Sequence, residues 1–192
     1  RGTSVSIDGR TFIDQRPKEV EKRLEFGHFE GDFIESGKDG KGSLLVLVER
    51  KTRCPFIAYL EDRSNANVNQ LIEELLKDIP IKSLTIDNDI SFQKHEELSE
   101  MLNSAIYFCH PQSPNEKGTI ENRNKAIRRY VKKRSDLSSF PREHFKMVET
   151  KLCNRFMKCL NYKTPKEAFE EEILKTKKPP VCGMMSRILL AN

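Results

Sequence analysis

Hydrophobic residues in the first third of the chain fall into three short runs that polar turns separate. The segment HFEGDFIES (28–36) alternates between apolar and polar positions and ends at the glycine-rich turn GKDGKG (37–42). SLLVLVER (43–50) is almost continuously apolar, and PFIAYLE (55–61) forms a third run. Runs of this length joined by short connections predict three antiparallel strands.

The hydrophobic period then changes. A helix is predicted to begin near Ser64 or Asn65, because apolar residues follow at helical spacing: Val68, Leu71, Ile72, Leu75 and Leu76. Beyond it the pattern predicts a fourth strand over 81–88, a second helix over 92–102 and a fifth strand over 105–109. Alternation of strands with helices is typical of parallel pairing, so the later strands are expected to extend the sheet in parallel.

Helical patterns dominate the last third of the chain. After the loop HPQSPNEK, one helix is predicted over 119–134 and a longer one over 141–160, whose apolar stripe is either core or a contact between subunits. The sequence TPKE (164–167) is a capping box with proline at the first helical position, so a last helix begins there. Three antiparallel strands followed by alternating helices and strands predict an α/β fold: a mixed five-stranded sheet flanked by helices, an order that matches ribonuclease H-like folds.

Length and composition limit the possible organisation. The 192 residues fit one large domain with appendages: a polar lead-in over 1–25, a core over 26–175 and a tail over 176–192. Because 34 Lys and Arg only slightly exceed 29 Asp and Glu, for a net charge of +5, an anionic partner must be met by a local basic patch. Five scattered cysteines predict free thiols in a reducing cytosol, and no apolar run reaches the roughly 18 residues that a membrane helix needs. The chain begins at Arg1, so we expect it to be a fragment.

Two carboxylates lie where apolar strands would be expected to continue. Asp32 is in the middle of the first predicted strand, and Asp87 ends the fourth. If these strands are neighbours, the two anions approach each other, which is costly unless a cation lies between them. Glu121, on the first turn of the helix after the proline-containing loop, could complete a site for Mg²⁺ or Mn²⁺, and two such ions are the usual device for displacement at phosphorus. Asp89 is expected to be a turn residue, and any one of these acids taken alone is more often solvated surface.

The helix that carries Glu121 is also basic. Glu121 and Arg128 are two turns apart, ~10.5 Å along one face, so a cation there could hold a phosphate beside the reacting one. The alternative is a solvated basic face. His95 is expected to pack or cap a helix, whereas His110 and Gln112 could touch DNA or belong to a plain loop. The residues predicted to contact DNA phosphates are Lys117, Arg123, Lys125, Arg128, Arg129 and Lys132.

Several local sequences resemble the signature blocks of one family. They are GHFEGD, LVERKTR, LTIDND, PQSPNEKGTIEN and NYKTPKEAF, in this order over roughly residues 16–170. These blocks resemble those of bacterial insertion-sequence transposases of the IS-thirty type, which are DDE transposases akin to retroviral integrases in their catalytic core. In that pattern the catalytic trio falls on Asp32, Asp87 and Glu121, with 33 residues between the last two, and the basic residue after the glutamate falls on Arg128. The main departure is an aspartate where the family has the glycine of Asp-Asn-Gly.

The resemblance implies a metal-dependent DNA transposase. The three carboxylates would bind two Mg²⁺ or Mn²⁺ ions, water would cut the element's end, and the resulting 3′-hydroxyl would attack target DNA. It also implies terminal repeats and target DNA as partners, a homo-oligomer of at least two copies, a location in the bacterial cytoplasm at the nucleoid, and a DNA-binding helix-turn-helix outside this chain. Two alternatives remain open: a ribonuclease H-like nuclease that hydrolyses without joining, and an inactive DNA-binding relic, for which the extra aspartate is the support.

Overall fold

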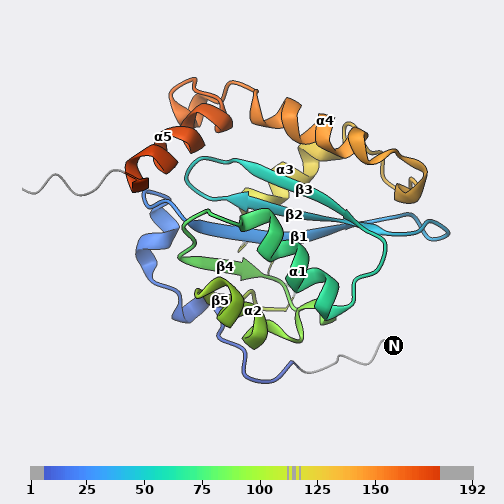
Figure 1. Ribbon diagram of the computed structural model, residues 1–192, viewed down its shortest axis with the longest axis horizontal. Helices are drawn as coiled ribbons and strands as arrows, with labels where there is room; N and C mark the ends of the chain where they lie inside the picture. Colours follow the sequence, from blue (N-terminus) through green and yellow to red (C-terminus); the bar gives the residue numbers. More distant parts are fainter. Residues whose placement is uncertain (1–6, 112, 114–115, 117, 178–192) are drawn as a thin grey trace, which may run out of the picture.

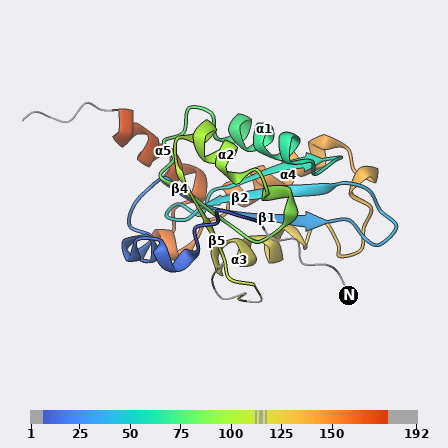
Figure 2. The ribbon, with the colours of Figure 1, turned by 90° about the horizontal axis from the view of Figure 1, so that it is seen from below.

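The fold is built on one five-stranded sheet, seen from two directions in Figures 1 and 2. The computed structural model describes residues 7–111, 113, 116 and 118–177. The strand order is β3-β2-β1-β4-β5, with β1, β2 and β3 antiparallel and with β4 parallel to both β1 and β5. The strands are β1 (His28–Glu35), β2 (Ser43–Glu49), β3 (Pro55–Leu60), β4 (Ser83–Ile86) and β5 (Ala105–Phe108). Both the number of strands and their directions confirm the sequence prediction.

Helices cover both faces of this sheet. Figure 2 shows α1 and α2 on one side of the strands and α3 on the other. Helix α4 joins α3, because apolar residues of both pack into one cluster on β2 and β3. We call the two sides the α1/α2 face and the α3/α4 face. The helices are α1 (Asn65–Leu76), α2 (His95–Leu102), α3 (Gly118–Ile127), α4 (Arg142–Cys153) and α5 (Pro165–Lys177).

The alternation of side chains along the strands divides the core into two apolar layers. Phe29, Leu45 and Leu84 belong to the cluster under α1 and α2. Leu44 and Val46 belong to the cluster under α3 and α4. Strand β2 lies second from one edge with helices over both faces, and every one of its residues is buried. This position explains why its sequence is an almost unbroken apolar run rather than an alternating one.

The helix starts agree with the sequence better than the helix ends. The capping box is present: the Thr164 hydroxyl accepts a hydrogen bond from the Glu167 amide at 3.1 Å, and the Glu167 carboxylate accepts one from the Thr164 amide at 2.7 Å. The predictions of helices over 119–134 and 141–160 are too long. Helix α3 gives way to tight turns after Ile127, and α4 ends at Cys153. Phe156, expected on the apolar stripe, is 70% exposed in the turn that follows.

The polar lead-in packs against the sheet. It contains two short 3-10 helices, η1 (Ile13–Gln15) and η2 (Lys18–Lys22). Ile7 and Val20 are buried, and Phe12 forms a parallel bridge with Phe108 at the edge of β5. The segment around Thr11 and Phe12 therefore covers the β5 edge of the sheet, where the Phe108 amide donates to the Thr11 carbonyl and which would otherwise expose unpaired backbone groups. None of the helices in the described ranges is both long and apolar enough to cross a bilayer.

Candidate active site and nucleic-acid interface

The pairing of β1 with β4 brings two of the predicted carboxylates to the same place in the sheet. Glu30 of β1 lies opposite Thr85 of β4 in a parallel ladder. The ladder ends at this pair; the same register continued by two residues would bring Asp32 level with Asp87, which directly follows the last residue of β4. Neighbouring strands are separated by about 4.8 Å, and residues two apart on a strand point to the same face. Both carboxylates therefore belong to the α3/α4 face.

Helix α3 is docked on the carboxylates of β1. The Ile120 amide donates a hydrogen bond to Glu30 Oε2 at 2.8 Å, and the Asn124 side-chain amide donates to Asp32 Oδ2 at 2.7 Å. Glu121 is half-buried and lies three residues before Asn124, so the two share a helix face. Both line an open hollow whose other residues are Lys125, Arg128 and Lys133. The helix thus presents Glu121 next to the Asp32 side of the sheet.

The donor chemistry of these three acids suits a hard divalent cation. Carboxylate oxygens are the preferred ligands of Mg²⁺ and Mn²⁺. Their side chains share a sheet face and a helix docked on it, but within the described residues no three His, Cys, Asp or Glu side chains close into a group that could hold a metal. The Asn124 amide bonds one oxygen of Asp32 instead. The strands and the helix that carry the three acids are arranged as a metal site would need, but in the described structure the three side chains do not converge on one point.

The extra aspartate of the IDND sequence serves the turn, as expected. Asp89 Oδ1 accepts a hydrogen bond from the Ser91 amide at 2.8 Å and so caps the 3-10 helix η3 (Ile90–Phe92). Its other oxygen pairs with Arg63 at 3.1 Å. The backbone φ of Asp89 is −69°, a value that any residue adopts, so the position imposes no need for glycine. The side chain of Asp89 thus serves the turn and Arg63, while its backbone amide donates a hydrogen bond to Asp87 Oδ1 at 3.3 Å.

The predicted phosphate contacts divide by burial. Lys125, Arg129 and Lys132 are exposed, and Arg128 is half-buried with its guanidinium donating to the Glu35 carbonyl at 3.2 Å. Burial lowers the pKa of Arg128. These residues follow α3 into a set of turns rather than a continuous helix to 134, which corrects the predicted geometry. Lys117 and Gln112 lie outside the described residues.

Arg123 differs from its basic neighbours because it points into the protein. Its side chain is buried and donates hydrogen bonds to the Arg53 carbonyl at 2.6 Å and to Met157 Sδ at 3.6 Å. Burial lowers the pKa of its guanidinium. Arg123 therefore anchors α3 to the β2–β3 turn. The sequence carried a signal for this, because Arg123 lies three residues after Ile120 and four before Ile127, both fully buried.

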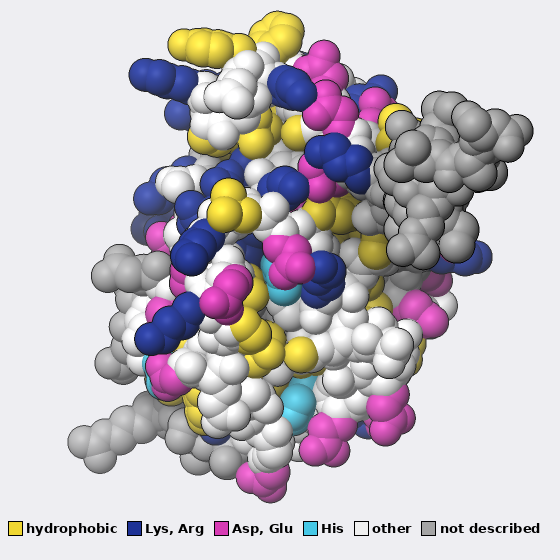
Figure 3. Space-filling model, turned by 90° about the vertical axis from the view of Figure 1, so that its left-hand side faces the viewer, with side chains coloured by type: hydrophobic (Ala, Val, Ile, Leu, Met, Phe, Trp, Pro, Cys, Tyr) yellow, Lys and Arg dark blue, Asp and Glu magenta, His cyan; other side chains and the backbone are white. Residues whose placement is uncertain are grey.

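Basic side chains are unevenly distributed on the face that carries α5 and the lead-in. Figure 3 views the molecule from the side of α5 and the lead-in and shows Lys and Arg mostly in its upper half, interspersed with Asp and Glu.

His95 is buried edge-on against Phe108 at 4.9 Å between ring centroids, as expected. His110 stacks on Phe12 and is hydrogen-bonded to Glu116 at 2.9 Å, which raises the pKa of His110.

Sequence comparison with known proteins relates the chain to insertion-sequence transposases. No protein-family model matches the chain. It is 35% identical over 179 residues to the transposase InsI for insertion sequence element IS30A of Escherichia coli K12, covering 92% of this chain and 46% of that protein. It is 38% identical over 169 residues to the transposase for insertion sequence element IS4351 of Bacteroides fragilis, covering 87% of this chain and 52% of that protein. The chain thus spans about half the length of these relatives.

Solved structures show the fold. The catalytic core domain of BIV integrase superposes with a TM-score of 0.64 at 16% identity, covering 79% of this chain and 99% of that one. A simian T-cell lymphotropic virus intasome gives a TM-score of 0.63 at 14% identity, covering 86% of this chain and 59% of that one. The mixed sheet is therefore ribonuclease H-like, as in integrase cores. The chain is homologous to the insertion-sequence transposases of the IS30 type, and the part of them that it spans has the fold of a retroviral integrase catalytic core.

Proposed function

We propose that the chain is the catalytic domain of a DNA transposase, which cuts DNA at the ends of a mobile element and joins the freed 3′-hydroxyl to target DNA. The observation that supports the proposal most is the parallel β1–β4 register, which ends two residues before Asp32 and Asp87, together with the hydrogen bond from Asn124 of α3 to Asp32. A chain that merely folded would have no reason to align two carboxylates on adjacent strands, since like charges repel. Homology to transposases supplies the reaction class.

In this proposal Asp32, Asp87 and Glu121 hold one or two Mg²⁺ or Mn²⁺ ions. When bound, such ions stabilise negative charge on the attacking and leaving oxygens of a phosphodiester. The protein's own part is to orient the ligands. Asn124 fixes the orientation of the Asp32 carboxylate by a hydrogen bond to one of its oxygens. The docked first turn of α3 keeps Glu121 within reach of the same edge.

The basic residues around the hollow are proposed to grip DNA. Lys125, Arg128 and Arg129 border or follow Glu121, so phosphates bound there would flank the reacting one. Lys117 and Lys132 complete the proposed set, whereas Arg123 holds the fold together. The proposal includes terminal repeats and target DNA as partners, a homo-oligomer of at least two copies on paired ends, and action at the bacterial nucleoid.

A branched DNA substrate tests the reaction without knowledge of the terminal repeat. The reverse of joining, in which a 3′-hydroxyl attacks the phosphodiester at a branch point, must use the same active-site groups by microscopic reversibility. Wild-type protein with Mn²⁺ should resolve a labelled branched DNA into a continuous strand and a released end. Asp32→Asn, Asp87→Asn and Glu121→Gln should each abolish the product.

One gel, together with a melting measurement in Mn²⁺, distinguishes three outcomes. A resealed strand that depends on all three acids supports the transposase. Cleavage without resealing would identify a nuclease that hydrolyses only. Absence of both products, together with an unchanged melting temperature in Mn²⁺, would overturn catalysis and leave a DNA-binding role.

A further inference from the structure

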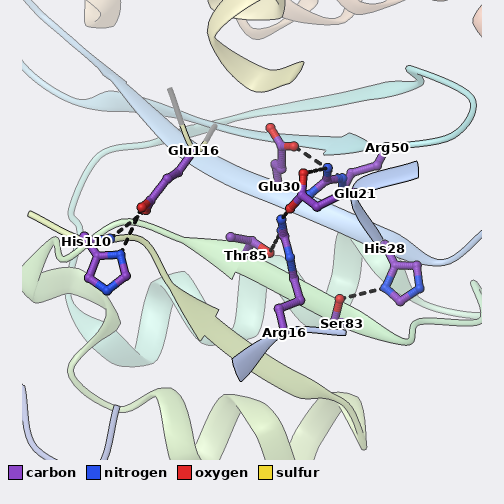
Figure 4. A network of polar contacts seen from close by, with 9 residues as sticks. All are labelled: Arg16, Glu21, His28, Glu30, Arg50, Ser83, Thr85, His110 and Glu116. Carbon is purple, nitrogen blue, oxygen red and sulfur yellow. Dashed lines mark hydrogen bonds and ion pairs between the residues drawn. The ribbon is translucent and has the colours of Figure 1, made fainter. Parts of the chain in front are cut away.

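A chain of buried polar contacts crosses the α3/α4 side of the sheet next to the proposed site (Figure 4). Glu30 and Arg50 are both almost fully buried, and their side chains approach to 3.5 Å between Arg50 Nε and Glu30 Oε1. Arg50 continues to Glu21 at 3.4 Å, and Glu21 is also paired with Arg16. Arg16 then donates a hydrogen bond to the Thr85 hydroxyl at 2.8 Å. We call these five residues the buried network, in which Glu21, with 61% of its side chain exposed, joins the two buried arginines at the surface.

The network ends beside each of the three proposed metal ligands. Glu30 is two residues before Asp32 on the same strand face, and Thr85 is two residues before Asp87. The other carboxylate oxygen of Glu30, Oε2, accepts a hydrogen bond from the backbone amide of Ile120. Ile120 is the residue immediately before Glu121.

The three elements that carry the acids are therefore bonded to one set of side chains. We propose that Glu30 is a positioning residue for the active site and that the buried network holds β1, β4 and the first turn of α3 in one arrangement. The catalytic meaning of this inference rests on the proposed function. Glu30 satisfies one of the amides that a helix N-terminus leaves without an internal partner, and its negative charge favours the positive end of the helix. Its place between Arg50 and α3 lets one carboxylate fix both the strand pair and the helix.

The arrangement uses strong contacts at a cost that packing alone would not require. Two arginines and a glutamate are desolvated here, and burial lowers the pKa of Arg16 to about 10 and lowers that of Arg50. Apolar residues of similar volume often stabilise a core as well as buried ion pairs do. The hydrogen bonds that Glu30 accepts from the Ile120 amide and that Arg16 donates to Thr85 are charge-assisted, and such bonds fix direction as well as distance. We assign their directional role to the alignment of the three acids.

Glu30→Ala tests the proposal, with Glu49→Ala as the matched control. Glu49 is an equally buried strand carboxylate whose hydrogen bonds go to Gly27 and Thr52, and it reaches the network only through its charge on Arg50. Hydrogen exchange should show the Ile120 amide opening roughly tenfold or more faster in Glu30→Ala and not in Glu49→Ala beyond the change in global stability. Mn²⁺ affinity, and kcat on branched DNA, should fall roughly 10- to 100-fold in Glu30→Ala, while KM for DNA stays within about twofold.

Two further variants keep the test decisive if Glu30→Ala does not fold. Glu30→Gln keeps an oxygen that can accept from Ile120 and should recover part of kcat. Arg16→Met breaks the contact with Thr85 and should lower kcat without opening the Ile120 amide, since Glu30 still holds it.

Unchanged Ile120 exchange in a folded Glu30 variant would overturn the proposal, and so would equal losses of kcat in Glu49→Ala. If wild-type protein neither binds Mn²⁺ nor acts on branched DNA, the proposed function fails, and faster Ile120 exchange still supports the network as the link between β1 and α3.

Discussion

The two faces of the sheet are buried to a similar extent but have different chemistry. The α1/α2 face has a large apolar layer in which Phe29, Leu47 and Leu84 pack under the helices, and the buried Glu49 lies at one end of it opposite Phe29. The α3/α4 face has its own apolar layer but also holds Glu30 and Asp32 on β1, within hydrogen-bond reach of α3. The same strands build both faces, so secondary structure does not explain the difference. Both faces have a buried apolar layer, whereas the side-chain hydrogen bonds that join a strand to α3 or α4 lie on the α3/α4 face.

The polar contacts of the α3/α4 face have specific partners. Glu149 of α4 accepts a hydrogen bond from the Ile57 amide at 2.7 Å, and Glu30 accepts one from Ile120 at 2.8 Å. Each joins a helix to a strand. Buried charges left unpaired would be strongly destabilising, whereas paired ones contribute little net stability. The comparison therefore teaches that this face is specified for geometry, and mutations on the two faces should separate activity from stability.

The largest expected effect is on activity at Asp87. Asp87→Asn should reduce resolution of branched DNA roughly 10³-fold or more, because it removes a proposed metal ligand. Its melting temperature without metal should stay the same or rise, since one of two aligned negative charges is lost. Asp89→Asn is the matched control, because the asparagine can still cap the turn, and it should keep activity within a few-fold. Similar losses in both variants would mean that Asp87 has no special role.

The opposite behaviour is expected on the apolar face. Leu84→Ala should lower the free energy of unfolding by about 2–5 kcal/mol, because it leaves a cavity in a fully buried layer. Urea denaturation measures this change, and Leu174→Ala, at a site that is 62% exposed, should cost less than about 0.5 kcal/mol. Turnover of the folded fraction of Leu84→Ala should match the wild type. A loss of turnover at temperatures where the variant is fully folded would show that the two faces are not independent.

Arg123 and Lys125 lie on the same helix, α3, and allow a buried basic residue to be compared with an exposed one. Arg123→Met should lower the free energy of unfolding by about 1–3 kcal/mol, because the Arg53 carbonyl loses its donor. Its DNA affinity and salt dependence should not change. Lys125→Ala should leave stability unchanged and should reduce the slope of log affinity against log salt by about 0.9. Titration of labelled duplex DNA at several salt concentrations separates these results, and a salt slope that changes in Arg123→Met would contradict the structural role.

Sequence alone predicted the sheet correctly and nominated three acids for the site, but it could not predict the contacts that orient side chains around them. Asp32 and Asp87 stand out because each interrupts an apolar run. Glu30 does not, since an acid on a strand is more often surface and its main donor is a backbone amide 90 residues away. Whether the three carboxylates converge on one point depends on their side-chain rotamers. The hydrogen bond from Asn124 selects the rotamer of Asp32. The end of α4 was also hidden, because Phe156 continues the helical period although the chain has already turned.

The smallest expected effect is a pH dependence at His28, at the start of β1. Its Nδ1 is hydrogen-bonded to Ser83 at 2.8 Å and its Nε2 to Glu25 at 2.9 Å. Burial lowers the pKa of His28, with Lys82 and Arg50 adding to the effect and Glu25 opposing it.

The unfolded chain therefore binds the His28 proton more readily than the folded one. Stability from this group is complete above the ordinary histidine pKa of about 6.5, and it falls as pH decreases from there through the lowered pKa of the folded state. The partly exposed His110 acts in the other direction. Glu116 raises the pKa of His110, so its contribution is present below about 6.5 and is lost as pH rises through the raised value.

Urea denaturation between about pH 5 and 7.5 should thus give a shallower loss of stability with acid in His28→Gln than in wild type, and a steeper one in His110→Gln. Added salt should weaken the His110 effect more, because that group is the more exposed of the two. An unchanged slope in His28→Gln would mean that Glu25 offsets the desolvation of the ring completely. In that case the stability contributed by the polar contacts at the start of β1 would depend on pH only through their exposed groups. This would distinguish them from the buried contacts around Glu30.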